Sequence, residues 1–388
     1  MPQCIRLPGD RLLAWIHASG DDVSTPPPDV DVIVAVHTSL RPVERAVSSA
    51  LENERARVRV SVVAHNTDPE AIAARLGPLA HRDDVRVLDI ADGITSPSGP
   101  FNRGLDAATG EFTSVLGSDD AFAPGAVDSW LHVARRDGAA AVIARLRHAG
   151  GRAVPTPPAR PFRRRRLDPV RDRLSYRSAP LGLVSRAVFP ELRFATGLPS
   201  GEDIPYVTEV WFSGHPISLD RTGPPYLMHA DAVDRVTHAA MAVEEEFGYL
   251  PGVLASGRLG RMSKAERSAL AMKLLRINMF GAVRNRPEAA AWTTGERNAI
   301  AARAREVLAV GGGIERVLSR ADRELLDAIL DPEAPVETLL SAERLRRRRL
   351  APASLLPRNL RSAMHREAPL RFAAASAAAL VDLRRTAR

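Results

Sequence analysis

The sequence predicts an α/β protein: a mostly parallel sheet with helices on both faces, followed by an all-α C-terminal region. In the first half, short runs rich in β-branched residues alternate with amphipathic helical patterns, as in sheets built from strand–helix–strand units. Beyond about Val236 such runs stop and every pattern is helical. The chain has 388 residues, 45% hydrophobic and 26% charged, which is enough for more than one core-forming domain and too apolar for disorder.

The strands begin after a boundary at residues 25–28, where three consecutive prolines favour a stiff, extended segment. Runs buried on both faces are typical of parallel strands with helical crossovers, and helical patterns lie between or after these runs. The predicted strands are residues 30–36, 58–63, 85–90, 112–116 and 139–144, and the predicted helices are 41–51, 68–76, 101–108 and 125–136.

Residues 150–173 interrupt this alternation with several prolines and four consecutive arginines, which predicts a long surface segment. Regular structure is expected again at 181–189, 203–212 and, as a strand, 216–219. Helices are expected at 239–247, 264–279, 294–310, 314–329 and 336–345. The predicted division is an N-terminal extension (1–28), an α/β domain (29–238), a helical domain (239–345) and an Arg/Ala-rich tail (346–388).

Charge and cysteine content exclude several classes of protein. Cys4 is the single cysteine, so a disulfide-stapled secreted scaffold is excluded, and no leader-like or membrane-spanning apolar run is visible. We therefore expect a cytoplasmic protein. The net charge of +8 comes from residues 341–388, which hold 12 arginines and 3 acidic residues. With 5% aromatic residues and no zinc, RRM-like or helix-turn-helix signature, a nucleic-acid partner is not expected.

Two acidic pairs are the main candidates for chemistry. Asp119 and Asp120 follow an apolar strand, and ligands of parallel sheets bind outside the carboxyl ends of the strands. One carboxylate could coordinate a hard cation and the other could accept a sugar hydroxyl, although both could also simply solvate a turn. Glu202 and Asp203 open a helix, where they either favour the helix dipole or provide a general base.

A third segment places Asn102 and Arg103 at the expected start of a helix, facing an anionic ligand. In their order along about residues 30–238, these segments resemble the family 2 glycosyltransferases of the GT-A fold. The matching segments are 32–38 with 47–51, Asn102-Arg103-Gly104 with 108–112, Gly117-Ser118-Asp119-Asp120, and Gly201-Glu202-Asp203.

The resemblance implies an inverting enzyme that moves a sugar from a nucleotide-diphosphate donor, with a UDP-sugar favoured. It is similar to bacterial cell-surface polysaccharide and wall teichoic acid glycosyltransferases, so the implied acceptor is a hydroxyl of a glycan, a polyol-phosphate polymer or a lipid-linked chain. Asp203 would be the base, supported by Glu202, and Mn²⁺ or Mg²⁺ would be held by Asp120, Asp119 and His229. The implied donor-binding residues are Val36, His37, Thr38, His65, Asn66, Asn102, Arg103, Ser118, Asp119 and Arg235.

Two departures from the family pattern keep an alternative open. Gly117 stands where the metal motif usually begins with Asp, and Ala64-His65-Asn66 replaces an acidic turn that reads the base. They motivate the alternative of a catalytically decayed domain that acts as a scaffold in polysaccharide assembly. A nucleotidyltransferase would need a Gly-rich, Lys-containing loop near the first strand, which is absent from the sequence.

The basic tail has two interpretations. Its arginines could bind an anionic polymer or anionic lipid head groups, which would place the protein peripherally on the inner face of the membrane. They could equally form a solvated surface. A homo-oligomer is a further expectation.

Overall fold

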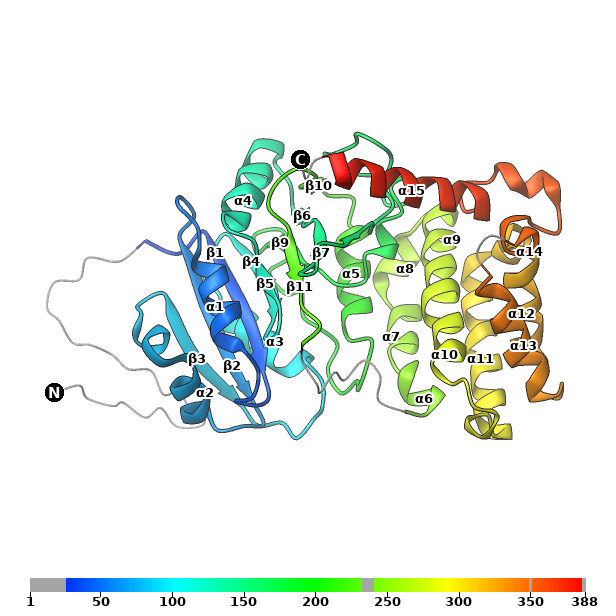
Figure 1. The fold of residues 1–388 in the computed structure, drawn as a ribbon, viewed down its shortest axis with the longest axis horizontal. Helices are drawn as coiled ribbons and strands as arrows, with labels where there is room; N and C mark the ends of the chain where they lie inside the picture. Colours follow the sequence, from blue (N-terminus) through cyan, green and yellow to red (C-terminus); the bar gives the residue numbers. More distant parts are fainter. Residues whose placement is uncertain (1–25, 232–240, 349–350, 386–388) are drawn as a thin grey trace, which may run out of the picture.

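The computed structural model describes residues 26–231, 241–348 and 351–385. An α/β region is followed by a helical region, as the sequence predicts (Figure 1). The α/β region is built on a seven-stranded sheet of order β10-β6-β9-β4-β1-β2-β3. Its strands are β1 (Val30–Val36), β2 (Val58–His65), β3 (Val85–Ile90), β4 (Phe112–Gly117), β6 (Ala141–Ile143), β9 (Gly182–Ser185) and β10 (Ile217–Leu219).

All pairs in this sheet are parallel except those of β9, which is antiparallel to β4 and to β6. The predicted mostly parallel sheet is therefore confirmed. In the register around β1, Val36 pairs with Ala64 of β2, and Ala35 pairs with Gly117 of β4. The carboxyl ends of β1, β2 and β4 consequently meet at one edge of the sheet.

A second, smaller sheet of order β5-β11-β7-β8 lies beside the first. Residues 150–173 were expected to form a long surface segment. Part of that segment is instead strand β8, which belongs to this second sheet. The segment also buries Asp172, which accepts two hydrogen bonds from the Arg160 side chain at 2.8 and 2.7 Å. The strands of this sheet are β5 (Ala121–Phe122), β7 (Leu146–His148), β8 (Ala153–Val154) and β11 (Tyr226–Met228).

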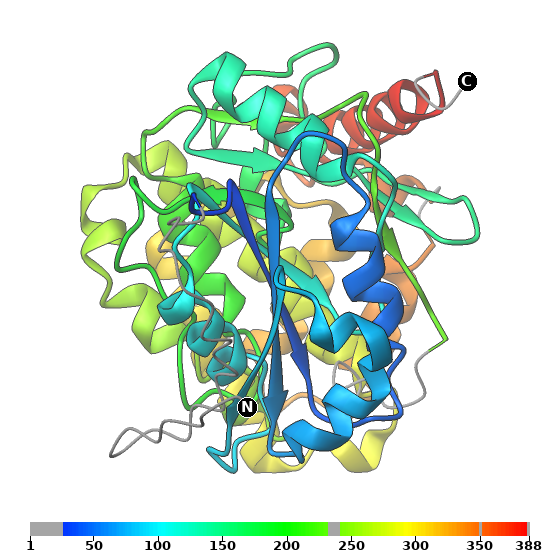
Figure 2. The same cartoon turned by 90° about the vertical axis from the view of Figure 1, so that its left-hand side faces the viewer.

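Helices cover both faces of the large sheet (Figure 2). Alternate residues of β1 enter two different cores, since Val32 and Val34 pack on one face and Ile33 on the other. The first core includes α1 (Val43–Leu51), α2 (Pro69–Leu76) and α4 (Ala126–Asp137). The second includes α3 (Ser98–Ala107) and α5 (Asp203–Trp211), and it continues into the helical region.

The region after residue 241 is helical, as predicted, but α7 and α8 lie where no helix was predicted, and the predicted helix 239–247 begins outside the described residues. Two further predicted helices differ locally. The predicted helix 264–279 is α9 (Lys264–Lys273) followed by a π-helical stretch (Leu274–Met279). The predicted helix 314–329 is divided because Ser319 caps α12, accepting a hydrogen bond from the Asp322 backbone at 2.9 Å. The helices are α6 (Val243–Glu246), α7 (Leu250–Leu254), α8 (Gly257–Arg261), α10 (Phe280–Asn285), α11 (Thr294–Gly311), α12 (Arg320–Leu330), α13 (Val336–Arg346) and α14 (Pro352–Leu355).

The predicted Arg/Ala-rich tail includes α15 (Pro369–Arg385). This helix lies along the top of the helical region in Figure 1 and reaches back to the α/β region, where it packs against β8. Just before it, Glu367 is buried against Arg173 and Arg276. Within the described ranges, no helix is both long and apolar enough to cross a membrane.

Candidate functional site

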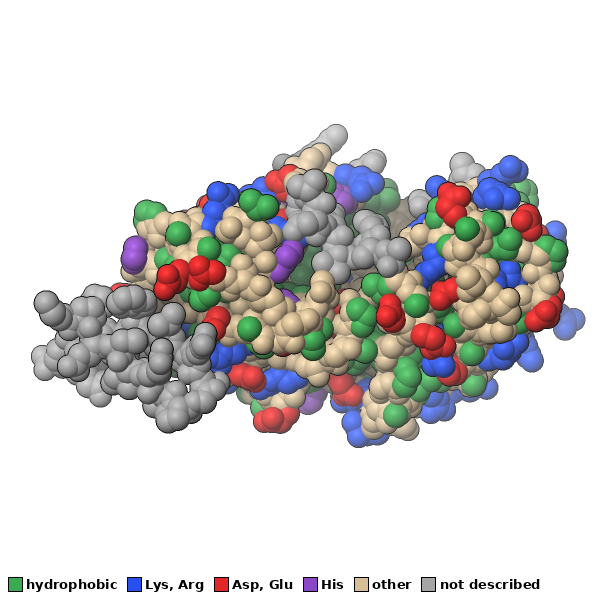
Figure 3. Space-filling model, turned by 90° about the horizontal axis from the view of Figure 1, so that it is seen from below, with side chains coloured by type: hydrophobic (Ala, Val, Ile, Leu, Met, Phe, Trp, Pro, Cys, Tyr) green, Lys and Arg blue, Asp and Glu red, His purple; other side chains and the backbone are tan. Residues whose placement is uncertain are grey.

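The residues that follow β1, β2 and β4 lie at one edge of the large sheet because these strands are parallel and in register. His37 is exposed, Thr38 is partly buried and accepts a hydrogen bond from the Leu40 backbone at 3.3 Å, and Ser118 is buried. Seen from below, the surface is hollowed between the α/β and helical regions, with histidine side chains beside the hollow (Figure 3). The predicted contact of these residues with a donor nucleotide stays a prediction.

The acidic turn after β4 is held by β11. Tyr226 donates its hydroxyl hydrogen to Asp120 Oδ2 at 2.7 Å and accepts a hydrogen bond from the Gly117 backbone at 3.1 Å. The His229 backbone N–H donates to Asp120 Oδ1 at 2.9 Å. Burial raises the pKa of Tyr226 well above its ordinary value, so the phenol remains a donor. Both oxygens of Asp120 are therefore fixed in position by β11 and the residues after it.

The glycine at the start of this turn has a steric reason. A Cβ at Gly117 would lie 3.0 Å from Asp120 Oδ2 and 3.3 Å from Asp119 Oδ1. Any side chain at this position would therefore crowd both carboxylates. A larger residue at this position would require the two carboxylate groups to shift by a few tenths of an ångström.

Two arginines that the sequence analysis missed flank the turn. Arg41, which is 7% exposed, pairs with Asp119 at 3.1 Å. Arg45 donates to the Asp119 carbonyl and pairs with Asp231 at 2.6 Å, and this hydrogen bond lowers the pKa of Asp231 to about 2. The available signal was their place just after the first strand, with Arg41 before α1 and Arg45 in its first turn.

A second polar cluster forms at the ends of β2 and β3. His65 Nε2 lies 2.9 Å from Asp92 Oδ1, and Asn66 bonds to His65 and Asp92 at 3.0 and 3.3 Å. Asn66 has φ 52°, a left-handed conformation that Asn tolerates. Burial would raise the pKa of Asp92, but these bonds and one from the Ile94 backbone outweigh it and lower the pKa. Asp92 was missed, although it follows the third parallel strand.

Asn102 has a different place from the one predicted. Helix α3 begins at Ser98, three residues earlier than expected, so Asn102 and Arg103 lie beyond its first turn. The Asn102 amide is used to hold the Phe194 backbone, donating at 2.9 Å and accepting at 2.8 Å. Arg103 is partly buried and lies in the electrostatic field of Arg86. Asn102 thus has a structural contact, and its contact with a nucleotide stays a prediction.

The Glu202–Asp203 pair stands at the start of α5. Gly201 before it has φ +77°, and a Cβ there would come within 2.3 Å of the Tyr249 ring, so only glycine fits. Both carboxylates are partly buried. Burial raises the pKa of Glu202, and the neighbouring charge of Asp203 raises it further. Burial also raises the pKa of Asp203, although the positive charge of Lys273 opposes this change. A carboxylate of raised pKa is a suitable proton acceptor near neutral pH.

The predicted three-ligand metal set is not assembled. Among the residues that the structure describes, no group of three His, Cys, Asp or Glu side chains could hold a metal ion. Asp119 pairs with Arg41, and His229 contacts Asp120 through its backbone N–H. Arg235 lies outside the described residues.

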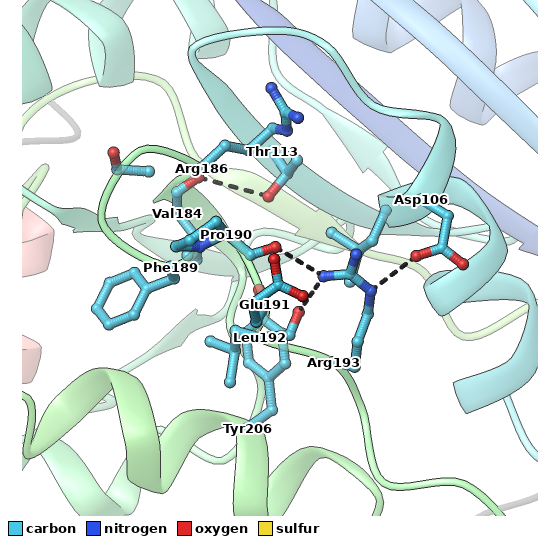
Figure 4. A pocket seen from close by; sticks show the side chains of 12 residues that line it. Asp106, Thr113, Val184, Arg186, Phe189, Pro190, Glu191, Leu192, Arg193 and Tyr206 are labelled. Atoms are coloured by element: carbon cyan, nitrogen blue, oxygen red, sulfur yellow. Dashed lines mark hydrogen bonds and ion pairs between the residues drawn. The ribbon is translucent and has the colours of Figure 1, made fainter.

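A cavity of about 240 Å³ lies near the opposite edge of the sheet, where β4 starts (Figure 4). Thr113, Arg186, Glu191 and Tyr206 are among its lining residues. Arg193 donates from Nε to Asp106 at 2.8 Å, which ties the cavity wall to α3. The cavity is separate from the acidic turn, which follows the other end of β4.

Comparison with known proteins agrees with this architecture. Residues 31–193 match the model of Glycosyl transferase family 2. The succinoglycan biosynthesis protein ExoO of Rhizobium meliloti (strain 1021) is 36% identical over 118 residues, which cover 30% of this chain and 32% of that protein. The match thus spans about a third of that relative's length.

Among solved structures, the chain resembles S. aureus TarS 1-349 in complex with UDP-GlcNAc, with a TM-score of 0.66 and 17% identity, covering 82% of this chain and 91% of that one. The complex of the same protein with UDP gives a TM-score of 0.65 at 15% identity over the same shares of the two chains. At these identities the likeness shows a common fold, and the predicted GT-A fold is confirmed.

Proposed function

We propose that this chain, whose residues 31–193 form a family 2 glycosyl transferase domain, transfers a sugar from a UDP-sugar to a hydroxyl group of a cell-surface polymer. The observation that carries the proposal is the acidic turn after β4, fixed by Tyr226 and flanked by Arg41 and Arg45. It stands at the sheet edge where parallel α/β folds bind nucleotides. The relatives named above support the donor and the acceptor class.

For the donor, the two polar clusters offer complementary chemistry. The guanidinium groups of Arg41 and Arg45 suit the diphosphate, since Arg recognises phosphate oxygens through several N–H groups. Asp92, with His65 and Asn66, offers hydrogen-bond donors and acceptors for the edge of a uracil base. This carboxylate at the end of β3 compensates for the acidic residue that β2 lacks.

A divalent cation, Mn²⁺ or Mg²⁺, fits the donor set that remains. Asp120 and His229 would hold it, and such ions commonly take their other ligands from substrate phosphates and water. When bound, the cation neutralises charge on the departing diphosphate. Tyr226 fixes the Asp120 carboxylate, so that the turn is ordered before the donor arrives.

Asp203 would accept the proton of the attacking hydroxyl. Glu202, the residue before it, would support Asp203 in this role. An attack opposite the leaving diphosphate inverts the sugar carbon without a covalent intermediate. Exposed arginines at residues 163–166 suit an acceptor that carries phosphate or other negative groups. The decayed-scaffold alternative is not favoured, since residues 31–193 match a transferase family model.

The test combines nucleotide binding with donor turnover. UDP is titrated calorimetrically with and without Mn²⁺ into the wild type, Asp203→Asn and Asp120→Asn, and UDP release from a panel of UDP-sugars is measured. We expect Asp203→Asn to bind UDP normally and to lose about 10²–10⁴-fold in turnover, because the base is gone. Asp120→Asn should lose the Mn²⁺-dependent part of binding.

The matched control is Asp83→Asn, because Asp83 is an exposed carboxylate of the α/β region. This substitution should change neither the affinity for UDP nor the rate of UDP release. Near-normal turnover by Asp203→Asn would remove Asp203 from the role of base. Absence of both nucleotide binding and donor turnover in the wild type would refute the proposed function.

A further inference from the structure

The outward face of α15 is apolar, although this helix lies along the rim of the molecule (Figure 1). At the two ends of this face, the Leu370 and Val381 side chains are 45% and 55% exposed. The opposite face packs inward through Phe372 and Ala379. A surface helix normally turns polar residues toward water, so a helix that is apolar on both faces calls for a partner that covers it. The outer face of α15 consists of residues spaced three or four apart, as on one side of a helix: Leu370, Ala373, Ala374, Ala377 and Val381.

The 3₁₀ turn Leu360–Met364, just before α15, continues this apolar face. Its first and last side chains, those of Leu360 and Met364, are 63% and 77% exposed. Arg371 donates a hydrogen bond to the Met364 carbonyl at 2.6 Å, so the turn lies directly against the start of α15. Single exposed apolar residues are ordinary on a protein surface, but a contiguous group of them marks a site of contact with a partner.

A loop with an exposed aromatic ring lies beside the second half of α15. Phe162 is 76% exposed, and its φ of 62° is a backbone conformation that bulky residues rarely adopt. Two residues later, the Arg164 carbonyl accepts a hydrogen bond from the Leu219 backbone at 2.7 Å. Leu219 in turn lines a small cavity together with Ala379 of α15. Of the seven large hydrophobic side chains that are exposed among the described residues, five therefore belong to α15, to the turn before it or to this loop.

Exposed arginines surround these apolar side chains. Arg163–Arg166 follow Phe162 directly, and Arg361 and Arg371 lie at the start of α15. Among the described residues, no carboxylate forms an ion pair with any of these arginines, and none is exposed in residues 156–172 or 351–381. The three carboxylates described in those two segments are partly or fully buried: Asp168, Asp172 and Glu367. Residues 162–166, the turn 360–364, the outer face of α15 and Arg371 together form an apolar–basic surface.

We propose that this apolar–basic surface docks onto an anionic lipid bilayer. Apolar side chains enter the boundary between head groups and acyl chains, and nearby arginines bind the lipid phosphates. A soluble polyanion, such as the acceptor suggested above for Arg163–Arg166, would engage the arginines but leave Phe162 and the outer face of α15 in water. A second copy of this chain would bring two sets of unpaired positive charges together. The bilayer is the partner that suits both the apolar and the basic side chains.

The experiment measures flotation of the protein with vesicles of phosphatidylcholine, with and without phosphatidylglycerol. We expect binding to the anionic vesicles alone, weakened by salt because salt screens exposed charges. Leu370→Ser/Val381→Ser should lose at least about tenfold in affinity, because its apolar face no longer leaves water. One arginine near an anionic surface contributes about 1 kcal/mol, or about fivefold, so Arg163→Gln/Arg165→Gln should lose at least about tenfold.

Three further variants separate this surface from general effects of charge and apolar area. Leu40→Ser changes an apolar side chain that is 88% exposed after β1 and should bind vesicles as the wild type does. Arg55→Gln/Arg261→Gln removes two exposed arginines from other parts of the molecule and should also have no effect. Phe162→Asn should weaken binding without disturbing the loop, because Asn tolerates a positive φ.

Failure of the wild type to bind anionic vesicles would overturn the inference. It would also be overturned if Phe162→Asn and Leu370→Ser/Val381→Ser bound vesicles as tightly as the wild type, while inorganic polyphosphate bound through the same arginines. That result would assign the surface to a soluble polyanion. A wild-type dimer that dissociates in Leu370→Ser/Val381→Ser, with no vesicle binding, would assign the face to a second copy. None of these results depends on the proposed transfer reaction, which UDP binding and donor turnover test separately.

Discussion

The anchoring of α15 leads to a quantitative prediction for Glu367→Gln. The Glu367 carboxylate is 5% exposed and accepts a hydrogen bond from the Tyr176 hydroxyl at 2.9 Å. It also pairs with Arg276 at 3.2 Å and with Arg173 at 3.3 Å, both of them buried. Phe372 of α15 packs its ring over both guanidinium groups, at 5.4 and 5.7 Å. Glutamine keeps the shape of this site and removes its negative charge.

The magnitude follows from what the substitution leaves behind. Two buried guanidinium groups lose their shared counterion, and breaking a buried ion pair from one side typically costs about 3–5 kcal/mol. Asp322 lies 3.8 Å from Arg276 and offsets part of this loss. We therefore expect about 3 kcal/mol, at the lower end of that range. At about 1.4 kcal/mol per factor of ten, the detached state of α15 becomes on the order of 100-fold more populated.

Limited proteolysis with trypsin measures that population, because cleavage tracks the open form when opening and closing are fast. Cleavage next to the arginines of residues 358–371 should accelerate by on the order of 100-fold in Glu367→Gln. Glu337→Gln, an exposed position on α13, is the control and should be cut as slowly as the wild type. Equal cleavage rates for Glu367→Gln and the wild type would show that the buried carboxylate does not hold α15 in place.

Two further substitutions test packing and the acidic turn. Gly104→Ala should destabilise the fold by about 1–3 kcal/mol in urea unfolding, because its Cβ would lie 2.3 Å from Ile33 of β1. The control is Gly260→Ala on α8, where an added Cβ would have no heavy atom within 4 Å, so the free energy of unfolding should stay the same or rise slightly. Equal effects of the two substitutions would contradict the close packing of Gly104 against Ile33. Tyr226→Phe removes the hydroxyl that accepts from the Gly117 N–H and donates to Asp120 Oδ2, a loss of about 1–3 kcal/mol. Calorimetry should show weaker Mn²⁺-dependent UDP binding, and wild-type affinity would mean that Asp120 does not need the phenol.

The strands of the large sheet were predictable because their burial depends on local composition. Runs of β-branched residues matched β1 and β3 at both ends, and β2 and β4 to within two residues. The short strands β7, β8 and β11 were not predictable, since two or three residues carry too little periodicity. The start of α3 was misplaced because prolines precede and enter it, although a first helical turn tolerates proline.

The candidate site was predictable where its residues follow strand ends or begin a helix, as Asp120 and Asp203 do. It was not predictable where a role depends on contacts between distant residues. Arg45 reaches Asp231 across 186 positions. Asn102 shows the converse, since its partner Phe194 lies 92 positions away and gives it a structural task.

The anchor of α15 also fixes the order in which this protein can be completed during synthesis. Glu367 is translated 91 residues after Arg276, an interval of about 5–20 s at typical rates of about 5–20 residues per second. Through that interval the two guanidinium groups lack the carboxylate that they share, and Asp322, 3.8 Å from Arg276, offsets part of that lack. The buried cluster of Arg173, Arg276 and Glu367 is therefore completed only after the end of the chain has been made.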